Sequence, residues 1–170
     1  MAFHGALLGI AIAVLIMAKR HHVPFFVLTD RIALVVPIGL FFGRLSNFIN
    51  GELYGRVTNL PWAMVFPNSD DQPRHPSQLY ESGLEGLLLG AIMLMLWRRG
   101  WLQQHGRVTG MLLAGYGMAR GMIEFVREPD AQIGLLLDSV SMGQLLSVPM
   151  IIFGVYLIMR RSSSPVSYTH

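Results

Sequence analysis

Apolar residues fill five long stretches of the chain, and polar residues gather in the segments between them. The five stretches cover residues 3–18, 24–43, 83–97, 110–126 and 141–159. Backbone N–H and C=O groups cannot bond to water inside a bilayer, so a helix is the expected element in each stretch. Several stretches are shorter than the ~20 residues of a perpendicular span, so their ends must include interfacial residues. The pattern predicts an all-α fold, a polytopic transmembrane helix bundle of about five spans.

The composition supports this class, because 52% of the 170 residues are hydrophobic and only 14% are charged. We expect one transmembrane core over residues 1–161 and a polar, disordered cytoplasmic tail over 162–170. The absence of cysteine excludes disulfides, thiolate metal ligands and a cysteine nucleophile within the chain. No spacing of His, Asp and Glu suggests a metal site, and no cofactor is predicted. No basic patch with interleaved aromatic residues suggests nucleic-acid binding.

The two ends of the stretches differ in their basic residues. One side carries Lys19, Arg20, Arg98, Arg99, Arg107, Arg160 and Arg161. The other side carries Arg44, Arg56, Arg74 and Arg127. Because short cytoplasmic loops carry the excess of Lys and Arg, the first side is expected to be cytoplasmic. The N-terminus and the connections 44–82 and 127–140 would then face outward.

The connection over residues 44–82 is predicted to be a long extracytoplasmic loop. It is rich in turn residues, and long loops in compact folds are usually functional or disordered. Trp62 is expected to anchor it at the membrane interface. His75 precedes Pro76, which opens the third helix, and is interpreted as a cap or an organiser of the loop. Ser141 is expected to begin a capping box for the last helix.

The segment 43–56, GRLSNFINGELYGR, is the most informative part of the chain. It places two arginines, two asparagines and a glutamate beside an apolar helix, where charged side chains are costly. An arginine fork with amide donors and glycine-exposed backbone suits a phosphate headgroup better than a point charge does. The alternative is an interfacial loop whose arginines extend into lipid headgroups without a specific ligand.

The fourth stretch carries Tyr116, Arg120 and Glu124 at a four-residue spacing, which places them on one face of a helix. Arg120 is expected in the middle of a span, where an ionisable residue indicates a functional site. The structural alternative is that Arg120 and Glu124 neutralise each other inside the bundle. Small residues on the same helix offer close packing to a neighbour: Gly110, Ala114, Gly117 and Gly121.

Glu81 and Glu85 are four residues apart on the third helix, where like charges repel each other unless a cation lies nearby. Arg44, Arg56 or Arg74 could supply that cation. The two glutamates are interpreted as scaffolding for a site.

His4 lies at the outer edge of the first stretch, where an interfacial role competes with that of a proton acceptor. Asp30 and Arg31 are sequence neighbours, so their side chains are expected to diverge rather than to pair. The sequence suggests no function for either.

Six motifs resemble those of the prolipoprotein diacylglyceryl transferase family, keep their order and cover nearly the whole chain. They are FHG at 3–5, the run 43–56, RHPSQLYE at 74–81, GYG at 115–117 with Arg120 and Glu124, REPDAQ at 127–132 and SMGQ at 141–144. The run from Arg44 to Gly55 is similar to the family signature and is highly specific.

The resemblance implies a multi-pass enzyme of the bacterial inner (plasma) membrane whose active site faces the extracytoplasmic side. Such an enzyme transfers the diacylglyceryl group of phosphatidylglycerol to the lipobox cysteine thiol in the signal peptide of a preprolipoprotein. The products are a thioether and glycerol phosphate. The implied partners are phosphatidylglycerol, the lipobox signal peptide and other membrane lipids. The nucleophilic sulfur comes from the substrate, so the enzyme itself needs no cysteine.

Carried over by position, the resemblance implies that Arg44 and Arg120 bind the lipid phosphate and take part in catalysis. It implies His4 and Tyr116 as candidates for proton handling or orientation, and the choice between them stays open. It also implies a set of residues that bind substrate or shape the headgroup site: Asn47, Asn50, Glu52, Gly55, His75 and Glu124.

The chain departs from the family pattern at several positions. A family-typical His-Gly-Gly reads His4-Gly5-Ala6, Ser46 stands where Gly is usual, and Arg31 stands where an apolar residue is expected. The family also carries a further N-terminal portion, with membrane helices and a functional tyrosine, that is expected to be missing here. The chain is therefore expected to be a fragment, a short divergent homologue or half of a split enzyme.

Two functions of other classes compete with an active transferase. One is a catalytically impaired, lipid-binding membrane scaffold. The other is an ion-coupled transporter that uses Arg120 and Glu124 as a charge relay. Transporters of that kind are typically built from repeats with broken half-helices, and the sequence shows no internal repeat.

Overall fold

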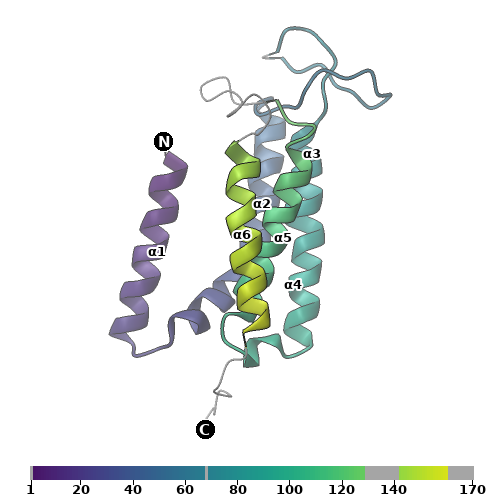
Figure 1. The fold of residues 1–170 in the computed structure, drawn as a ribbon. Coiled ribbons are helices and arrows are strands. Elements are labelled where there is room, and N and C mark those ends of the chain that lie inside the picture. The colour runs from purple at the N-terminus through teal and green to yellow at the C-terminus, as the bar shows by residue number, and fades with distance from the viewer. Residues whose placement is uncertain (1, 68, 129–141, 161–170) are drawn as a thin grey trace.

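Helices account for the regular structure of the described residues, and they form rods that run alternately up and down (Figure 1). The computed structural model describes residues 2–67, 69–128 and 142–160, with the backbone alone at 2–8 and 142. The helices are α1 (Ala2–Arg20), α2 (Phe25–Ile49), α3 (Ser77–Glu81), η1 (Ser82–Leu88), α4 (Leu89–Arg98), η2 (Trp101–Gln103), α5 (Arg107–Ile123) and α6 (Met142–Met159). Because α3, η1 and α4 follow one another without a break, they form a single rod.

The predicted all-α class is confirmed across the part of the chain that the structure describes, and each predicted stretch coincides with one rod. Two rods, Phe25–Ile49 and Ser77–Arg98, are long and apolar enough to cross a membrane. The count of five spans and the side that the long loop faces stay predictions. Ser141 and the tail over 162–170 lie outside the described residues.

The end of α2 corrects the prediction that a loop begins at Arg44. No glycine or proline interrupts residues 44–49, so the helix continues for more than a turn past residue 43 and carries Arg44 with it. It ends where Gly51 adopts a left-handed backbone with φ of 66°. The Gly51 N–H donates to the Phe48 carbonyl at 3.1 Å, and the Glu52 N–H donates to the Asn47 carbonyl at 3.0 Å. This glycine-dependent pattern satisfies the last carbonyls of a helix.

The third rod contains a π-helical stretch, η1, where it packs against α2. Gly86 permits the close approach, because a Cβ at that position would lie 2.6 Å from the Cβ of Phe41. The Ser82 hydroxyl donates to the Phe41 carbonyl oxygen across 3.3 Å. π-Helical stretches are rare and occur frequently at functional sites. Here the stretch begins directly after Glu81 and contains Glu85, so it brings the acidic pair against α2.

α5 and α6 pack closely along small residues, as the sequence predicts. A Cβ on Gly110 would lie 2.6 Å from the Gly154 carbonyl oxygen, and one on Gly154 would lie 2.6 Å from the backbone nitrogen of Ala114. A Cβ on Gly117 would also be crowded, at 2.9 Å from its nearest neighbour, whereas one on Gly121 would make only an ordinary contact at 4.0 Å. The prediction is confirmed for Gly110, Ala114 and Gly117, and Gly121 lies outside the tightest part of this contact.

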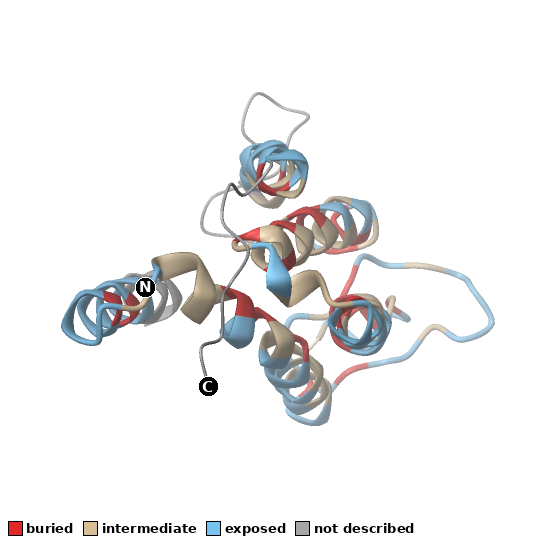
Figure 2. Cartoon of the chain, turned by 90° about the horizontal axis from the view of Figure 1, so that it is seen from below, coloured by how far each residue is buried: buried red, intermediate tan, exposed pale blue. Residues whose placement is uncertain are grey.

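The interior of the bundle differs between its two ends. An apolar cluster fills the half nearest the connection between α4 and α5: Ala33, Leu89, Met93 and Val108. Fully buried polar side chains gather toward the other end, where α3 begins: Ser77, Gln78, Glu81 and Glu85. α1 stands apart and, among the described elements, contacts only α2 (Figure 1, Figure 2). Because buried polar groups are costly unless they are paired, the polar end is the place to look for a site.

Asp30, for which the sequence suggests no function, joins α2 to the start of α5. Its buried carboxylate accepts hydrogen bonds from the backbone N–H groups of Gly106 and Thr109, both at 2.7 Å, and from the Thr109 hydroxyl at 2.6 Å. A helix N-terminus has unpaired N–H groups and a partial positive charge, so an anionic acceptor stabilises it. Asp30 is therefore a helix cap that a neighbouring helix supplies. Arg31 is exposed, so the two neighbours do diverge.

Candidate active site around Glu81

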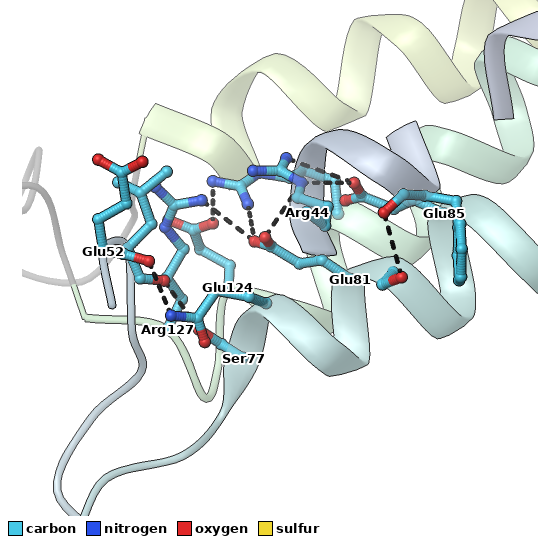
Figure 3. A network of polar contacts seen from close by, with 12 residues as sticks. Arg44, Glu52, Ser77, Glu81, Glu85, Glu124 and Arg127 are labelled. Atoms are coloured by element: carbon cyan, nitrogen blue, oxygen red, sulfur yellow. Dashed lines mark hydrogen bonds and ion pairs between the residues drawn. The ribbon is translucent and has the colours of Figure 1, made fainter. Parts of the chain in front are cut away.

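Glu81 is the centre of a cluster of charged side chains at the polar end of the bundle (Figure 3). It ends α3, is fully buried, and contacts arginines from three different segments. Arg44 of α2 places Nε 3.1 Å from Oε2 of Glu81. Arg120 of α5 and Arg127 each donate from Nη1 to Oε1, at 2.8 Å and 3.1 Å. One carboxylate thus holds three guanidinium groups together.

Two further carboxylates pair with the same arginines. Glu85, which is fully buried, accepts hydrogen bonds from Nε and Nη2 of Arg44, both at 3.4 Å. Glu124 lies 3.0 Å from Nη2 of Arg120 and is buried too. Three carboxylates therefore face three guanidinium groups, and their formal charges balance. This balance lets the cluster lie inside the bundle, because a buried ion is strongly destabilising unless it is paired.

The accessible part of the cluster is cationic. The side chains of Arg44 and Arg120 are 16% and 15% exposed, whereas those of Glu81 and Glu85 are fully buried. A guanidinium group carries five N–H donors in a fixed fork. The contacts described above use two of the three guanidinium nitrogens of Arg44 and two of those of Arg120. The arrangement can therefore offer donors to an anion while the buried carboxylates hold the arginines in place.

Arg44 and Arg120, which the resemblance assigns to one phosphate, lie together in the structure because both contact Glu81. The position of Arg120 corrects one expectation, since it lies in the last turn of α5 and not in the middle of a span. The helix ends sooner than predicted because the chain turns after Ile123 to bring Arg127 against Gly55. Arg120 also forms the ion pair with Glu124 that the structural alternative predicted. Arg120 therefore both neutralises Glu124 and shares Glu81 with Arg44.

Glu81 and Arg127 are the site residues that reasoning from the sequence underestimates. The sequence presents Glu81 with Glu85 as scaffolding in need of a cation, and Arg44 is that cation. Arg74 does not serve as that cation, because its guanidinium pairs with Asp70 and Glu128. Arg56 does not either, because its Nε donates to the Arg127 carbonyl oxygen at 2.8 Å. The available signal was an acidic pair within an apolar helix, which requires a cation from another segment.

Glu52 lies at the edge of the cluster (Figure 3), and Asn50 contacts it. Both are exposed, and the Asn50 amide donates to Oε1 of Glu52 at 3.2 Å. The Glu52 carbonyl oxygen accepts a 2.7 Å hydrogen bond from the buried amide of Gln78. Asn47 is half-buried on α2, one turn beyond Arg44. The backbone of this segment is thus fixed against α3, while its side chains border the arginines.

Gly55 lies where three segments cross. Its N–H donates to the His75 carbonyl at 2.9 Å, and its carbonyl accepts from Nη1 of Arg74 at 3.2 Å. A Cβ at this position would lie 2.5 Å from the Val126 carbonyl oxygen and 2.7 Å from the Cβ of His75. Only glycine fits such a close approach. The His75 ring is half-buried and meets the Tyr80 ring edge to face, so His75 belongs to the framework of the loop.

Arg74 clamps the outer part of this framework. Its Nε and Nη2 donate to the two oxygens of Asp70 at 3.0 Å and 3.1 Å, and it also pairs with Glu128. Its guanidinium carbon lies 5.0 Å from the centre of the Tyr54 ring. The hydrogen bonds from Arg74 hold the pKa of Asp70 below its ordinary value, and the same bonds raise the pKa of Arg74.

Tyr116 and His4, the two candidates for proton handling, lie on different helices. Tyr116 is one turn before Arg120 on α5 and packs against the apolar core cluster. His4 lies near the N-terminal end of α1, and its side chain lies outside the described residues. The choice between them stays open.

Comparison with known proteins gives a match over nearly the whole chain. The family described as prolipoprotein diacylglyceryl transferase has a sequence model that matches residues 1–160. The chain belongs to this transferase family. The resemblance in the six motifs is therefore confirmed, and the family together with the apolar helices indicates a membrane protein.

Curated relatives in the transferase family are more than half identical to this chain. A phosphatidylglycerol–prolipoprotein diacylglyceryl transferase from Polynucleobacter asymbioticus is 54% identical over 168 residues, which make up 96% of this chain and 62% of the relative. A protein of the same name from a Shewanella species is 53% identical over 94% of this chain and 59% of the relative. One from Rickettsia felis is 54% identical over 93% and 61%. The chain thus spans 59–62% of the length of these relatives.

The cluster around Glu81 combines partly exposed cationic donors with buried carboxylates, an arrangement suited to binding an anion. Preorganised cationic donors in a site that excludes water stabilise developing negative charge more than water does. The buried carboxylates supply the preorganisation, and the partly exposed arginines supply the donors.

Proposed function

We propose that this chain carries the phosphate-binding part of a transferase active site. In the proposed reaction, the diacylglyceryl group of phosphatidylglycerol passes to the lipobox cysteine thiol of a preprolipoprotein. The observation that carries the proposal is the convergence of Arg44 and Arg120 on the single buried carboxylate of Glu81. Family membership and the names of the relatives support the choice of reaction.

The reaction is a substitution at a glyceryl carbon. The cysteine thiolate attacks the carbon that bears the phosphate ester, a C–S bond forms, and the C–O bond to the phosphate breaks. The electron pair of that bond leaves with glycerol phosphate, and the thiol proton passes to a base. Negative charge grows on the phosphate as the bond breaks, so cations placed beside it lower the barrier.

Arg44 and Arg120 are suited to this task by their fork geometry and permanent charge. Arginine pairs with phosphate through two parallel hydrogen bonds, which orients the phosphate as well as attracting it. Glu81 holds both guanidinium groups on their buried side, so they need little reorganisation when the lipid arrives. We assign the role of positioning residue to Glu81, since it acts through the arginines.

A base must accept the thiol proton, because a free cysteine thiol has a pKa of about 8.5. His4 and Tyr116 are the candidates in this chain. Replacing the true base by a residue of similar shape, as in His4→Gln or Tyr116→Phe, should slow transfer most at neutral pH and least at high pH, where the substrate thiol ionises by itself. The other variant should keep the pH profile of the unmodified protein.

We further propose that the five rods are membrane spans in the bacterial inner membrane and that the Glu81 cluster faces the extracytoplasmic side. The charges of the rod ends support this orientation. One end carries basic residues in short connections: Lys19, Arg20, Arg98, Arg99, Arg107 and Arg160. The other end carries Arg44, Arg56, Arg74 and Arg127. Because the larger number of Lys and Arg residues in short connections marks the cytoplasmic side, the Glu81 cluster is assigned to the opposite side.

A lipidation assay tests the proposal. The protein is placed in vesicles that contain phosphatidylglycerol, a lipobox peptide is added, and thioether formation is followed by mass spectrometry. Arg44→Ala and Arg120→Ala should each reduce the rate by about 100-fold or more, the usual cost of removing a donor to a developing anion. Arg31→Ala, which removes an exposed arginine far from the cluster, should change little.

The assay also separates the competing functions. An unchanged rate in Arg44→Ala or Arg120→Ala would contradict the site. Binding of phosphatidylglycerol without transfer to the peptide would instead select the lipid-binding scaffold.

A further inference from the structure

The connection between α2 and α3, residues 50–76 and called the outer loop here, displays apolar side chains on its surface. Six large apolar residues are exposed: Leu53, Val57, Leu60, Trp62, Met64 and Val65. Trp62 and Val65 are the most open, at 57% and 56% exposed. Several exposed large apolar side chains within one segment are typical of a surface that a membrane or a partner protein covers. None of these six residues is needed for the arginine cluster described above.

Hydrogen bonds and ring packing inside the outer loop fix its backbone, so the exposed apolar side chains have defined positions. Thr58 donates from its N–H to the Pro73 carbonyl at 2.9 Å, and Met64 and Arg74 exchange two backbone hydrogen bonds at 2.9 Å and 3.0 Å. Phe66 is buried against the Tyr54 ring, with ring centres 5.4 Å apart. The loop therefore has its own small core, and the exposed apolar residues are the ones left outside it.

Charge is absent from the same part of the outer loop. The sequence from Val57 to Ser69 contains no Asp, Glu, Lys or Arg, and the charged residues Arg56 and Asp70 stand at its two ends. Charged side chains are costly in the hydrocarbon region of a membrane, so a surface that enters it must lack them. Residues 57–69 meet that requirement, because none of them is charged.

The position of the outer loop shows where its apolar surface lies. The loop begins and ends on the two rods that are long and apolar enough to span a membrane, so it is rooted at the membrane boundary. In both views it reaches sideways past the helices (Figure 1, Figure 2). Such an overhang places it above the lipids that surround the bundle.

Trp62 joins the outer loop to α3. Its indole N–H donates to the hydroxyl of Tyr80 on α3 across 2.7 Å. Tryptophan and tyrosine concentrate at the membrane–water interface, where an apolar ring and a polar group are both satisfied. The pair therefore sets the depth at which the loop would meet the membrane.

We infer that residues 57–65 of the outer loop dock onto the lipid surface of the outer leaflet, with Trp62 and Val65 at the boundary between headgroups and acyl chains. The inference rests on the membrane placement proposed above, and it does not depend on the transfer reaction. The loop thereby becomes a lateral arm on the membrane surface beside the arginine cluster.

Tryptophan quenching in vesicles tests the docking directly, because the chain has three tryptophans. In one variant, Trp97→Phe and Trp101→Phe leave Trp62 as the single reporter. In the matched control, Trp62→Phe and Trp101→Phe leave Trp97, which lies at the other end of the same membrane-spanning rod. Each protein is placed in vesicles of phosphatidylcholine and phosphatidylglycerol, and circular dichroism confirms that its helix content is unchanged.

Docking predicts that phosphatidylcholine brominated near the glycerol end of its acyl chains quenches Trp62, and that aqueous iodide quenches it little. If iodide but not brominated lipid quenches Trp62 while lipid quenches Trp97, the loop is in water and the inference is wrong. If neither agent quenches Trp62, protein covers it and the inference is also wrong. If brominated lipid fails to quench Trp97, the membrane placement fails as well. The rate of thioether formation is measured on the same samples. It tests the proposed reaction separately, because the docking of the loop and the transfer reaction can fail independently.

A second measurement uses the absence of natural cysteine. A nitroxide label on Val65→Cys is compared with one on Gln72→Cys, an exposed polar position at the charged end of the same loop. Oxygen concentrates in lipid, and a water-soluble nickel complex concentrates in water. The ratio of relaxation by oxygen to relaxation by nickel should be higher at position 65 than at 72. Equal ratios at the two positions would overturn the inference.

Discussion

Arg120 of α5 donates a 2.8 Å hydrogen bond to Glu81 of α3, and this contact joins two segments that look independent in the sequence. The same carboxylate also contacts Arg44 and Arg127. Because Glu81 is fully buried and shared, its charge controls the position of every arginine in the cluster.

Glu81→Gln should therefore destabilise the protein and slow transfer. The amide keeps the size of the side chain but leaves three guanidinium groups to share the two remaining carboxylates, Glu85 and Glu124. Removing one partner from a buried ion pair costs roughly 3–5 kcal/mol. The measurements are the temperature at which helix content is lost and the rate of thioether formation. Asp71→Asn makes the same change of charge at an exposed position and serves as the control. Equal stability and rate in the two variants would show that Glu81 does not position the arginines.

Asp30→Ala should lower the free energy of unfolding without a direct effect on the arginine cluster. The substitution removes the three hydrogen bonds that Asp30 accepts from the start of α5, and it leaves the one between the Thr109 and Thr29 hydroxyls. One hydrogen bond to a charged group contributes roughly 1.5–3 kcal/mol, so the loss should be at least that large. Loss of helix content during denaturation measures it. The neighbouring exposed residue supplies the control, Arg31→Ala, and a similar midpoint for both variants would refute the capping role of Asp30.

Gly55→Ala should disturb the crossing at which residue 55 of the outer loop meets residue 75 of the same loop and residue 126. The added methyl group would lie 2.5 Å from the Val126 carbonyl oxygen, a distance that forces one segment to move. We expect slower transfer and faster proteolysis of the loop. Gly39→Ala is the matched control, because a Cβ there meets nothing within 4 Å and alanine favours the helix by about 0.5–1 kcal/mol. Resistance to proteolysis equal to that of Gly39→Ala would argue against the close contact.

Acid should loosen the outer loop through Asp70. The hydrogen bonds from Arg74 lower the pKa of this carboxyl in the folded protein from its ordinary value of 3.8. A lowered pKa means that the stabilising contribution is complete above 3.8 and is lost as the pH falls from there through the lowered value. The mobility of a nitroxide on Gln72→Cys should rise over that range. In Asp70→Asn the label should already be mobile at neutral pH and show no acid step; an acid step that persists there would assign it to another group.

The sequence was sufficient for the helical class and for the approximate rods. The length of an apolar stretch and the spacing of its apolar residues reflect burial and contact with lipid, and both can be read from the local sequence. The five apolar stretches therefore correspond to helices. The sequence also predicted the small-residue contact of α5 at Gly110, Ala114 and Gly117, because small residues at a regular spacing permit close approach of a neighbouring helix. The end of α2 was harder to place, because a left-handed Gly51 ends the helix one turn and more past the last apolar run.

The sequence alone determined which residue types the site contains. It showed the motif with Arg44, the four-residue spacing that puts Arg120 with Glu124, and an acidic pair that required a cation. Only the tertiary structure decided that Glu81 is the common partner, that Arg127 joins it, and that Asp30 caps α5. The physical reason is that spacing along a helix shows which way a side chain faces. The hydrogen-bonded partners in the cluster lie 39–46 residues apart in the sequence, and their arrangement depends on how the rods pack.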